Sequence, residues 1–369
     1  MGNVKGLPFV EIVERVANLA RIDSENDKPK VRGVIENLYL REIPRKYDWT
    51  FLLSSTSLFL NGQYNTGTVS ATTGGTTLNF SGATLAASMN KRKIKISGND
   101  YVYEFTFTNT STGTVEPAIY GDSNPSGASY TIFDPDYSLP SDFDRFPKGG
   151  GLIYSSGGSK TQIPEEAIQE YYTNYAYSPS IPEACHITGY DTAGNLKIEV
   201  RPAPSKDLSV GLDYIKQLRP LKITTSGVID TIASGGTTVT GSAGTTKFTE
   251  ATTGDYLRID ALGVGPDSKW YRIATITHNS SLTLSSAFAL TGVNSCNYTI
   301  CSMPEYPEKM HDALIWGALR TLTGDQNDPM FQFYNIQLGE VLTDGKRLYV
   351  TRVPNQVIDS IATDYQYRR

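Results

Sequence analysis

The sequence has little of what most enzymes and nucleic-acid-binding proteins depend on. Its 369 residues include three cysteines and three histidines, and charged residues make up 19%. So sparse and odd a set of cysteines argues against a disulfide scaffold. A net charge of −5 argues against a protein that binds nucleic acid by neutralising phosphates. No apolar run approaches the ~18 residues of a membrane span, so we expect no membrane partner.

Motifs that carry catalysis or bind cofactors are also missing. The histidines His186, His278 and His311 have no metalloprotease spacing, and Cys296 and Cys301 lack a second pair at zinc-ligand spacing. No phosphate-binding glycine loop and no nucleophile elbow is found. We therefore expect no enzyme activity, no catalytic residue, no metal site and no cofactor.

What the sequence does have is an internal repeat within a chain of 33 glycines and 23 tyrosines. One copy runs from about Gly67 to Ile132 and the other from about Gly227 to Ile300. Matched pieces keep their order while their separation grows, which indicates one duplicated module with small insertions. The matched pieces are Gly74-Gly75-Thr76-Thr77 with Gly235-Gly236-Thr237-Thr238, Tyr103-Glu104-Phe105 with Tyr271-Arg272-Ile273, and Tyr130-Thr131-Ile132 with Tyr298-Thr299-Ile300.

Each copy has the pattern of short antiparallel strands. Residues 101–108 alternate aromatic side chains with Val, Glu and Thr, which is the signal of a half-buried strand. Glycine pairs interrupt the copies at short intervals, so we expect each to close as a small barrel or sandwich. Tyr101 and Trp270 are either exposed binding platforms or core residues of their modules.

The rest of the chain shows helical periodicity near both ends. Apolar residues recur at three- and four-residue steps over 7–22, 31–43 and 310–322, and again over 331–342 up to Gly345. Pro164, followed by two glutamates, predicts the start of a further short helix. Between these helices, residues 184–200 predict a β-hairpin.

The predicted fold class is therefore α+β: a helical-bundle frame with a β-hairpin region, interrupted by two duplicated small all-β insert domains of barrel or sandwich type. The division that follows is an N-terminal helical hairpin over 1–57, insert module 1 over 58–136, the β-hairpin region over 137–221, insert module 2 over 222–303, C-terminal helices over 304–345 and a C-terminal arm over 346–369.

The final two dozen residues form a basic tail on an acidic protein. Five cations stand against two acids, Asp359 and Asp364. Such a terminus is either frayed or a segment that docks on an acidic partner surface.

Two short segments outside the repeat carry a family resemblance. Arg45-Lys46-Tyr47-Asp48-Trp49 ends the N-terminal helices, and Leu139-Pro140-Ser141-Asp142-Phe143 follows the first insert. In this order the chain resembles the head-to-tail adaptor (connector) proteins of tailed bacteriophages. The repeats look like modules found inserted in such virion proteins. The second insert makes this chain larger than a minimal adaptor.

The resemblance implies a structural virion protein without catalysis. Such adaptors form a ring, usually a dodecamer, under the portal protein, extend the DNA channel and provide a platform for tail nozzle, tail tube or fibre proteins. DNA would pass through without sequence-specific contact. The protein would be made in the host bacterial cytoplasm and located at the capsid–tail junction. By analogy, the portal-binding residues would be Lys346, Arg347, Tyr349, Arg352, Tyr365, Tyr367, Arg368 and Arg369.

Two other functions remain open. The β-modules fit a receptor- or glycan-binding phage tail protein. A hydrolase of cell-wall polymers is disfavoured by the missing catalytic site.

Overall fold

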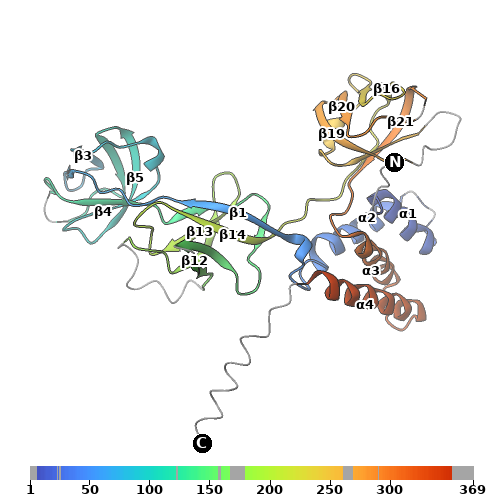
Figure 1. The fold of residues 1–369 in the computed structure, drawn as a ribbon, viewed down its shortest axis with the longest axis horizontal. Coiled ribbons are helices and arrows are strands. Elements are labelled where there is room, and N and C mark those ends of the chain that lie inside the picture. The colour runs from blue at the N-terminus through green and yellow to red at the C-terminus, as the bar shows by residue number, and fades with distance from the viewer. Residues whose placement is uncertain are drawn as a thin grey trace, which may run out of the picture. The chain divides into compact units, whose positions relative to one another are not determined.

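The structure is a computed structural model that describes residues 6–350 apart from 23, 25, 122–123, 157–158, 167–178, 261–268 and 290. The described chain forms 21 β-strands and four α-helices (Figure 1). It divides into two compact units. Unit 1 comprises Met1–Phe51 and Leu218–Arg369, and unit 2 comprises Leu52–Gln217.

Unit 1 contains all the described α-helices: α1 (Phe9–Leu19), α2 (Lys28–Asn37), α3 (His311–Thr323) and α4 (Pro329–Tyr349). The first is amphipathic and buries Ile12, Val13 and Val16 of the predicted stripe, and it also buries Phe9, which that stripe did not include. A π-helical turn, Leu38–Glu42, continues α2.

Capping residues define the two C-terminal helices. Gly324 follows α3 with a φ of 71°, a conformation that glycine adopts without strain. Asp328 then caps α4 by accepting a hydrogen bond of 2.7 Å from the Met330 amide, and Pro329 occupies the first helical position.

Unit 1 also contains a closed β-barrel, called barrel 2 here, which comprises β16 to β21. The strand order is β16-β17-β20-β19-β18-β21, and β21 pairs with β16 to close the sheet. A short strand, β15 (Ile223–Thr224), extends β21 at the point where the chain enters the barrel. The other strands are β16 (Ile229–Ile232), β17 (Thr238–Gly241), β18 (Tyr256–Asp260), β19 (Tyr271–His278), β20 (Ser281–Leu284) and β21 (Val293–Cys301).

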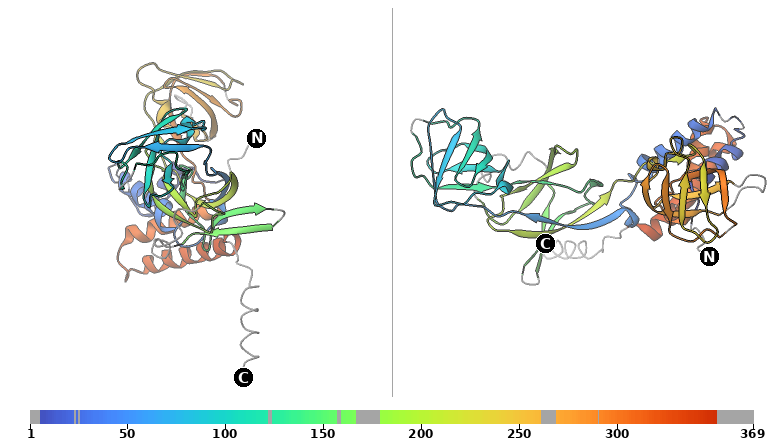
Figure 2. Two further views of the ribbon diagram at one scale, coloured as in Figure 1. Left: turned by 90° about the vertical axis from the view of Figure 1, so that its left-hand side faces the viewer. Right: turned by 90° about the horizontal axis from the view of Figure 1, so that it is seen from above.

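Unit 2 contains the corresponding barrel 1, which comprises β2 to β7. Its strand order, β2-β3-β6-β5-β4-β7, is the order of barrel 2 element for element. A bridge between Val69 and Ala128, just ahead of β7, closes the sheet, and Tyr64 pairs with Ile132 as β15 pairs with β21. In Figure 2 barrel 1 is drawn in light blue to cyan and barrel 2 in yellow to orange. The strands are β2 (Thr68–Ala71), β3 (Thr77–Ser81), β4 (Lys93–Ile96), β5 (Val102–Asn109), β6 (Thr112–Glu116) and β7 (Tyr130–Phe133).

Equivalent glycines open the two barrels. Gly67 and Gly227 have φ angles of 84° and 87°. A Cβ at Gly67 would lie 2.2 Å from the Ser81 carbonyl oxygen, and one at Gly227 would lie 2.6 Å from the Thr246 backbone. Both positions therefore require glycine for its conformation and for the close approach of a second backbone segment.

The remainder of unit 2 forms two further sheets over one shared core. A five-stranded sheet has the order β1-β14-β10-β11, with β9 pairing β14, and a three-stranded sheet has the order β12-β13-β8. Side chains from both sheets, among them Leu152, Cys185, Ile198 and Leu212, form that core. The strands are β1 (Leu53–Leu60), β8 (Asp136–Ser138), β9 (Phe143–Arg145), β10 (Gly151–Ser156), β11 (Ser159–Pro164), β12 (Ala184–Tyr190), β13 (Leu196–Arg201) and β14 (Leu208–Lys216).

The predicted fold class is wrong. The chain is mostly β, and its middle is a two-sheet β structure, not a stretch of a helical-bundle frame with a single hairpin. Pro164 illustrates the error, because it ends β11 instead of starting a helix, and Glu165 forms a bridge with Cys185. Among the described residues, α-helices are confined to the first and last parts of the chain.

Candidate functional site

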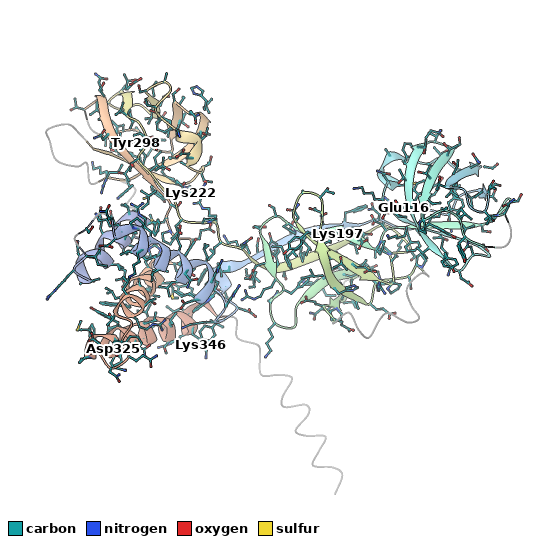
Figure 3. All side chains as sticks on the ribbon, turned by 180° about the vertical axis from the view of Figure 1, so that it is seen from behind. Glu116, Lys197, Lys222, Tyr298, Asp325 and Lys346 are labelled. Atoms are coloured by element: carbon teal, nitrogen blue, oxygen red, sulfur yellow. The ribbon has the colours of Figure 1, made fainter. Side chains whose placement is uncertain are left out.

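The predicted portal-binding residues begin in the last turn of α4. Lys346 and Arg347 are exposed there and Tyr349 is half-buried, so the helix extends four residues into the segment that the sequence analysis assigned to the arm. Figure 3 labels Lys346 at this end of the helix. The other predicted residues, Arg352, Tyr365, Tyr367, Arg368 and Arg369, lie outside the described residues.

An aromatic cluster holds the C-terminal end of α4. Trp49 is fully buried and lies 5.2 Å from the Tyr47 ring and 5.5 Å from the Phe51 ring, centre to centre. Phe51 in turn contacts Tyr349 of α4 at 5.9 Å. The Lys346 ammonium lies 5.0 Å from the centre of the Tyr47 ring, a cation–π distance.

Backbone contacts fix the same end. The Trp49 indole donates a hydrogen bond of 2.8 Å to the Ile43 carbonyl, and Trp49 forms an isolated bridge with Val350. The last described residue of the chain is thus tied to the segment that the resemblance singled out. Packing and hydrogen bonding together define the position of this end of α4 in unit 1.

Two buried tyrosines extend the cluster. Tyr306 donates a hydrogen bond of 2.7 Å to the Tyr39 carbonyl, and the Tyr39 hydroxyl accepts one of 3.2 Å from the Glu305 amide. Burial raises the pKa of both phenols well above the ordinary value, so both stay protonated and able to donate.

The outer face of α4 carries an exposed apolar stripe at helical spacing. Met330, Phe333 and Ile336 are 48%, 47% and 57% exposed. Exposed acids, Glu340 and Asp344, continue this helix toward its end. Exposed apolar side chains that line up on one helix mark a contact surface more often than isolated ones do.

Besides Lys346 and Arg347 at the end of α4, unit 1 has exposed cations on α2, in the π-helical turn and in the residues that follow it. These are Lys30, Arg41, Arg45 and Lys46. Unit 1 therefore presents an apolar and acidic helix face and, separately, a basic segment.

The histidines examined for chemistry are structural where they are buried. His311 accepts a hydrogen bond of 2.8 Å from the Leu7 amide at Nδ1, and its Nε2 lies 3.0 Å from the Tyr306 carbonyl oxygen. Burial lowers the pKa of His311, which favours the neutral ring that this pair of contacts requires. Across the hairpin of β12 and β13, His186 lies 3.1 Å from the carboxylate of Glu199. Glu199 also pairs with Arg201 of its own strand, β13.

The cysteines show no reactive environment. Cys185, Cys296 and Cys301 are all buried. Burial raises the pKa of Cys185 and of Cys301 to about 12, so these thiols are protonated at neutral pH. Among the described residues no group of three or more His, Cys, Asp and Glu side chains is placed to hold a metal ion. No helix in the described part of the chain is long and apolar enough to cross a membrane.

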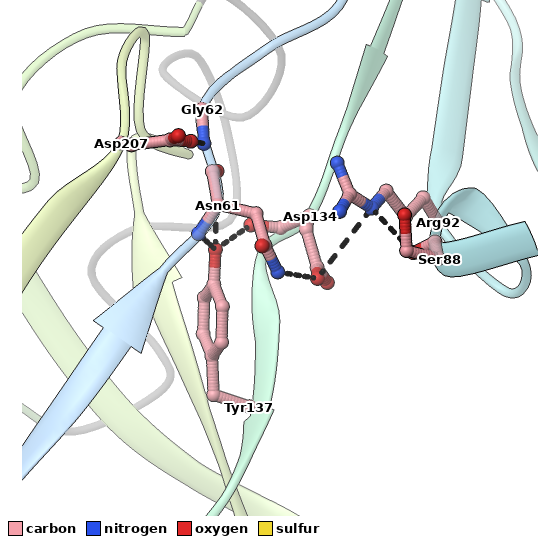
Figure 4. Close-up of polar contacts among 7 residues, drawn as sticks. All are labelled: Asn61, Gly62, Ser88, Arg92, Asp134, Tyr137 and Asp207. Atoms are coloured by element: carbon pink, nitrogen blue, oxygen red, sulfur yellow. Dashed lines mark hydrogen bonds and ion pairs between the residues drawn. The ribbon is translucent and has the colours of Figure 1, made fainter. Parts of the chain in front are cut away.

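A polar cluster anchors barrel 1 where the chain enters and leaves it (Figure 4). Arg92 of the barrel lies 3.9 Å from the carboxylate of Asp134, which also accepts a hydrogen bond of 3.0 Å from the Asn61 side chain. Tyr137 donates a hydrogen bond of 2.7 Å to the Asp134 carbonyl and accepts one of 3.0 Å from the Asn61 amide. Burial raises the pKa of Asp134, while the Asn61 hydrogen bond and Arg92 act in the opposite direction.

Barrel 2 is anchored by a different cluster at the corresponding place. Asp255 of the barrel is 1% exposed and lies 3.3 Å from the Arg219 guanidinium, which also contacts Glu305 at 3.4 Å. The second oxygen of Asp255 accepts a hydrogen bond of 2.8 Å from the Thr252 amide. Lys222, labelled in Figure 3, donates its backbone N–H to the Ser302 hydroxyl at 3.1 Å, which ties the two ends of the barrel together.

The two aromatic residues considered as binding platforms differ. Trp270 is 9% exposed, donates a hydrogen bond of 2.7 Å to the Glu11 carboxylate of α1 and lies under the Arg258 guanidinium at 5.0 Å. It is therefore a contact between barrel 2 and the helices. Tyr101 is 51% exposed and stands beside Tyr120, a residue that the sequence analysis did not single out. The segment around Tyr120 has no strand periodicity that would have marked it.

Comparison with known proteins does not place the chain in a family. No protein-family model matches it, and no curated protein matches it. Among solved structures, the chain is similar to the apo form of translation elongation factor SelB from Methanococcus maripaludis. The match covers 69% of this chain and 63% of that protein, with 9% sequence identity and a TM-score of 0.16. A similarity this low supports neither a shared fold nor a shared activity.

Proposed function

We propose that the protein is a structural virion protein, a head-to-tail adaptor that forms a ring under the portal, extends the DNA channel and offers an attachment platform for the tail. The observation that carries the proposal is the anchored end of α4. An aromatic cluster around Trp49 holds this helix end. The basic C-terminal tail, which follows in the sequence, would dock on the portal.

The helical part of unit 1 supports ring formation. A ring needs a heterologous interface, in which one surface of a subunit meets a different surface of its neighbour. Unit 1 has two such surfaces: the α4 face with Met330, Phe333, Ile336 and the acids Glu340 and Asp344, and the basic segment from Lys30 to Lys46. Their opposite charges suit a contact between neighbouring copies of this chain.

The buried groups support a role without catalysis. The buried histidine His311 is held by backbone partners, and the thiols of Cys185 and Cys301 are kept protonated by burial. Such groups hold a fold together and offer no nucleophile or general base to a substrate.

A binding experiment with the cognate portal ring tests the docking role of the tail. Replacement of Arg352, Arg368 and Arg369 by Ser should weaken binding and reduce its salt dependence, because three charge-assisted contacts are lost. Replacement of Lys91, Lys93 and Lys95 in barrel 1 by Ser is the matched control, with the same change in net charge. Equal binding by the tail variant and the wild type would contradict the proposal.

A further inference from the structure

Barrel 1 carries a pair of exposed tyrosines beside an open recess. Tyr101 is 51% exposed and Tyr120 is 65% exposed, and their ring centres are 5.0 Å apart at an interplanar angle of 62°. The recess has a volume of about 520 Å³. That volume is within the range of roughly 300–1,000 Å³ typical of small-molecule sites.

The two tyrosines are held in place by a half-buried asparagine and a buried tyrosine. The Asn99 side chain accepts a hydrogen bond of 3.0 Å from the Tyr101 amide and donates one of 2.6 Å to the Tyr120 carbonyl. Tyr103, which is fully buried, accepts hydrogen bonds from the Asn99 side chain at 2.8 Å and from the Tyr120 amide at 3.1 Å. These hydrogen bonds fix the backbone at Tyr101 and at Tyr120. Binding of a ligand to the two rings should therefore cost the protein little conformational entropy.

Barrel 2 has the equivalent hydrogen bond to a buried tyrosine and has no tyrosine pair at the corresponding positions. Its Tyr271 occupies the place of Tyr103 and accepts a hydrogen bond of 3.2 Å from the Ala289 amide. By the same alignment Lys269 and Ala289 stand where barrel 1 has Tyr101 and Tyr120. The exposed tyrosines are therefore no requirement of the barrel fold, since the sister barrel closes without them.

We infer that the recess of barrel 1 binds a carbohydrate. The non-polar face of a pyranose ring packs on exposed aromatic rings, while its hydroxyl groups need hydrogen-bonding partners around them. The recess offers both, because the polar side chains of Ser97, Asp100 and Ser126 line it together with Tyr101 and Tyr120.

The lining also indicates which carbohydrate fits. Among the described residues that line the recess, Asp100 is the only ionisable side chain other than the tyrosines, and its charge is negative. A neutral or amine-bearing sugar suits this recess, and an acidic sugar such as a sialic acid does not. A proline-rich peptide, which also packs on paired tyrosines, prefers a more apolar groove than one lined by two serines and an aspartate.

Saturation-transfer NMR and titration calorimetry on the full chain test the inference. The probes are chitotriose, maltotriose and a trisaccharide of glucosamine, with sialyllactose and a proline-rich decapeptide as contrasting ligands. We expect at least one of the first three to bind, with no binding of the last two. Tyr101→Ala and Tyr120→Ala should each weaken binding about tenfold, the equivalent of 1.4 kcal/mol.

Matched variants separate loss of the platform from loss of the fold. Tyr101→Trp keeps an aromatic face and should keep binding, and Lys269→Ala changes the equivalent position of barrel 2 and should have no effect. Failure of all three neutral or amine-bearing sugars to bind at millimolar concentration would overturn the inference. So would binding that survives both alanine substitutions, or binding of the peptide alone. None of these outcomes bears on docking to a portal, because the recess lies in unit 2.

Discussion

Arg92 of barrel 1 and Asp255 of barrel 2 occupy the same place in the two sheets and carry opposite charges. The Arg92 carbonyl accepts a hydrogen bond of 2.7 Å from Phe105, and the Asp255 carbonyl accepts one of 2.8 Å from Ile273. Each side chain then pairs with a residue outside its barrel, Asp134 for Arg92 and Arg219 for Asp255. The duplicated module thus has one fixed anchoring position, at which each copy has acquired its own partner.

Removal of the partner of Asp255 should destabilise barrel 2. Arg219→Ala leaves a carboxylate that is 1% exposed without its cation. Because Arg219 is itself one-third exposed, we expect a loss of roughly 1–3 kcal/mol, less than for a fully buried pair. The measurement is hydrogen exchange of the β18 and β19 amides.

A double substitution provides the control for this pair. Asp255→Asn in the Arg219→Ala background removes the buried charge and keeps an oxygen that can accept from the Thr252 amide. Most of the lost protection should return. If the double variant exchanges faster than Arg219→Ala alone, the buried charge is not the cause of the destabilisation.

The helical part of unit 1 should lose stability in mild acid through His311. The folded state lowers the pKa of His311 below its ordinary value of about 6.5, so the unfolded chain binds the proton more tightly. The neutral His311 ring makes its full contribution to the free energy of unfolding above the pKa of the histidine in the unfolded chain. This contribution is lost as the pH falls from about 6.5 toward the pKa of His311 in the folded protein. A proton on Nδ1 would also remove the acceptor for the Leu7 amide.

Amide exchange at Leu7 between pH 7 and pH 5 measures this effect. Protection in the wild type, corrected for intrinsic exchange, should fall over that interval. In His311→Gln, which cannot titrate, the same profile should be flat. A wild-type profile as flat as that of the glutamine variant would show that His311 is not the acid-sensitive group.

Two glycines of α4 should respond oppositely to alanine. A Cβ at Gly345 would lie 2.2 Å from the sulfur of Met310, which is fully buried, so Gly345→Ala should cost about 1–3 kcal/mol. A Cβ at Gly339 meets nothing within 4 Å, so Gly339→Ala should stabilise the helix by about 0.5–1 kcal/mol. Hydrogen exchange at Leu338 and Leu342 reports both changes, and shifts of the same sign would contradict the packing of α4 described above.

The exposed stripe of α4 should be needed for ring assembly. Phe333→Glu places a charge at the centre of the apolar contact proposed between neighbouring copies, and we expect at least a tenfold loss of assembled ring on the portal, about 1.4 kcal/mol. Asn335→Glu introduces the same charge at an exposed position of the same helix outside the stripe. Mass photometry of portal mixtures distinguishes the two variants, and equal loss in both would assign the effect to charge alone.

Part of the fold could be predicted from patterns in the sequence. The stripe that includes Ile12, Val13 and Val16 predicts α1, and the hairpin of β12 and β13 forms where the turn around Gly194 indicates it. The duplicated triplets at Tyr103 and Tyr271 lie in strands that hold the same place in the two barrels. In each case the signal is a period, a turn motif or a repeat in the sequence. Such a signal can be read without knowing which distant residues pair in the fold.

The structure of the middle of the chain could not be predicted from such patterns. The strands β10 and β11 lack alternation of apolar and polar residues, and they are strands because they pair with each other and because β10 pairs with β14. Pairing of β1 with β14 joins residues more than 150 positions apart, such as Leu58 and Val210. Such non-local pairing overrides local propensity, which is why only a β-hairpin region within a helical frame was predicted where two sheets form.

For the candidate sites, too, the sequence indicated only the residues that carry a local signal. The end of α4 was singled out by its charge, which is local, whereas the Trp49 cluster that anchors it joins three separate segments. Tyr101 was named as either an exposed binding platform or a core residue, whereas its neighbour Tyr120, which lies in a loop without periodicity, was not named at all.

Native mass spectrometry of the full chain, alone and mixed with the cognate portal ring, tests the adaptor function most directly. The account predicts a complex in which one ring of this chain, with a fixed number of copies, is added to each portal ring. Deletion of residues 351–369 should abolish that complex and leave the folded units intact. A chain that stays monomeric at every ratio of portal, with its tail present, would contradict the adaptor function.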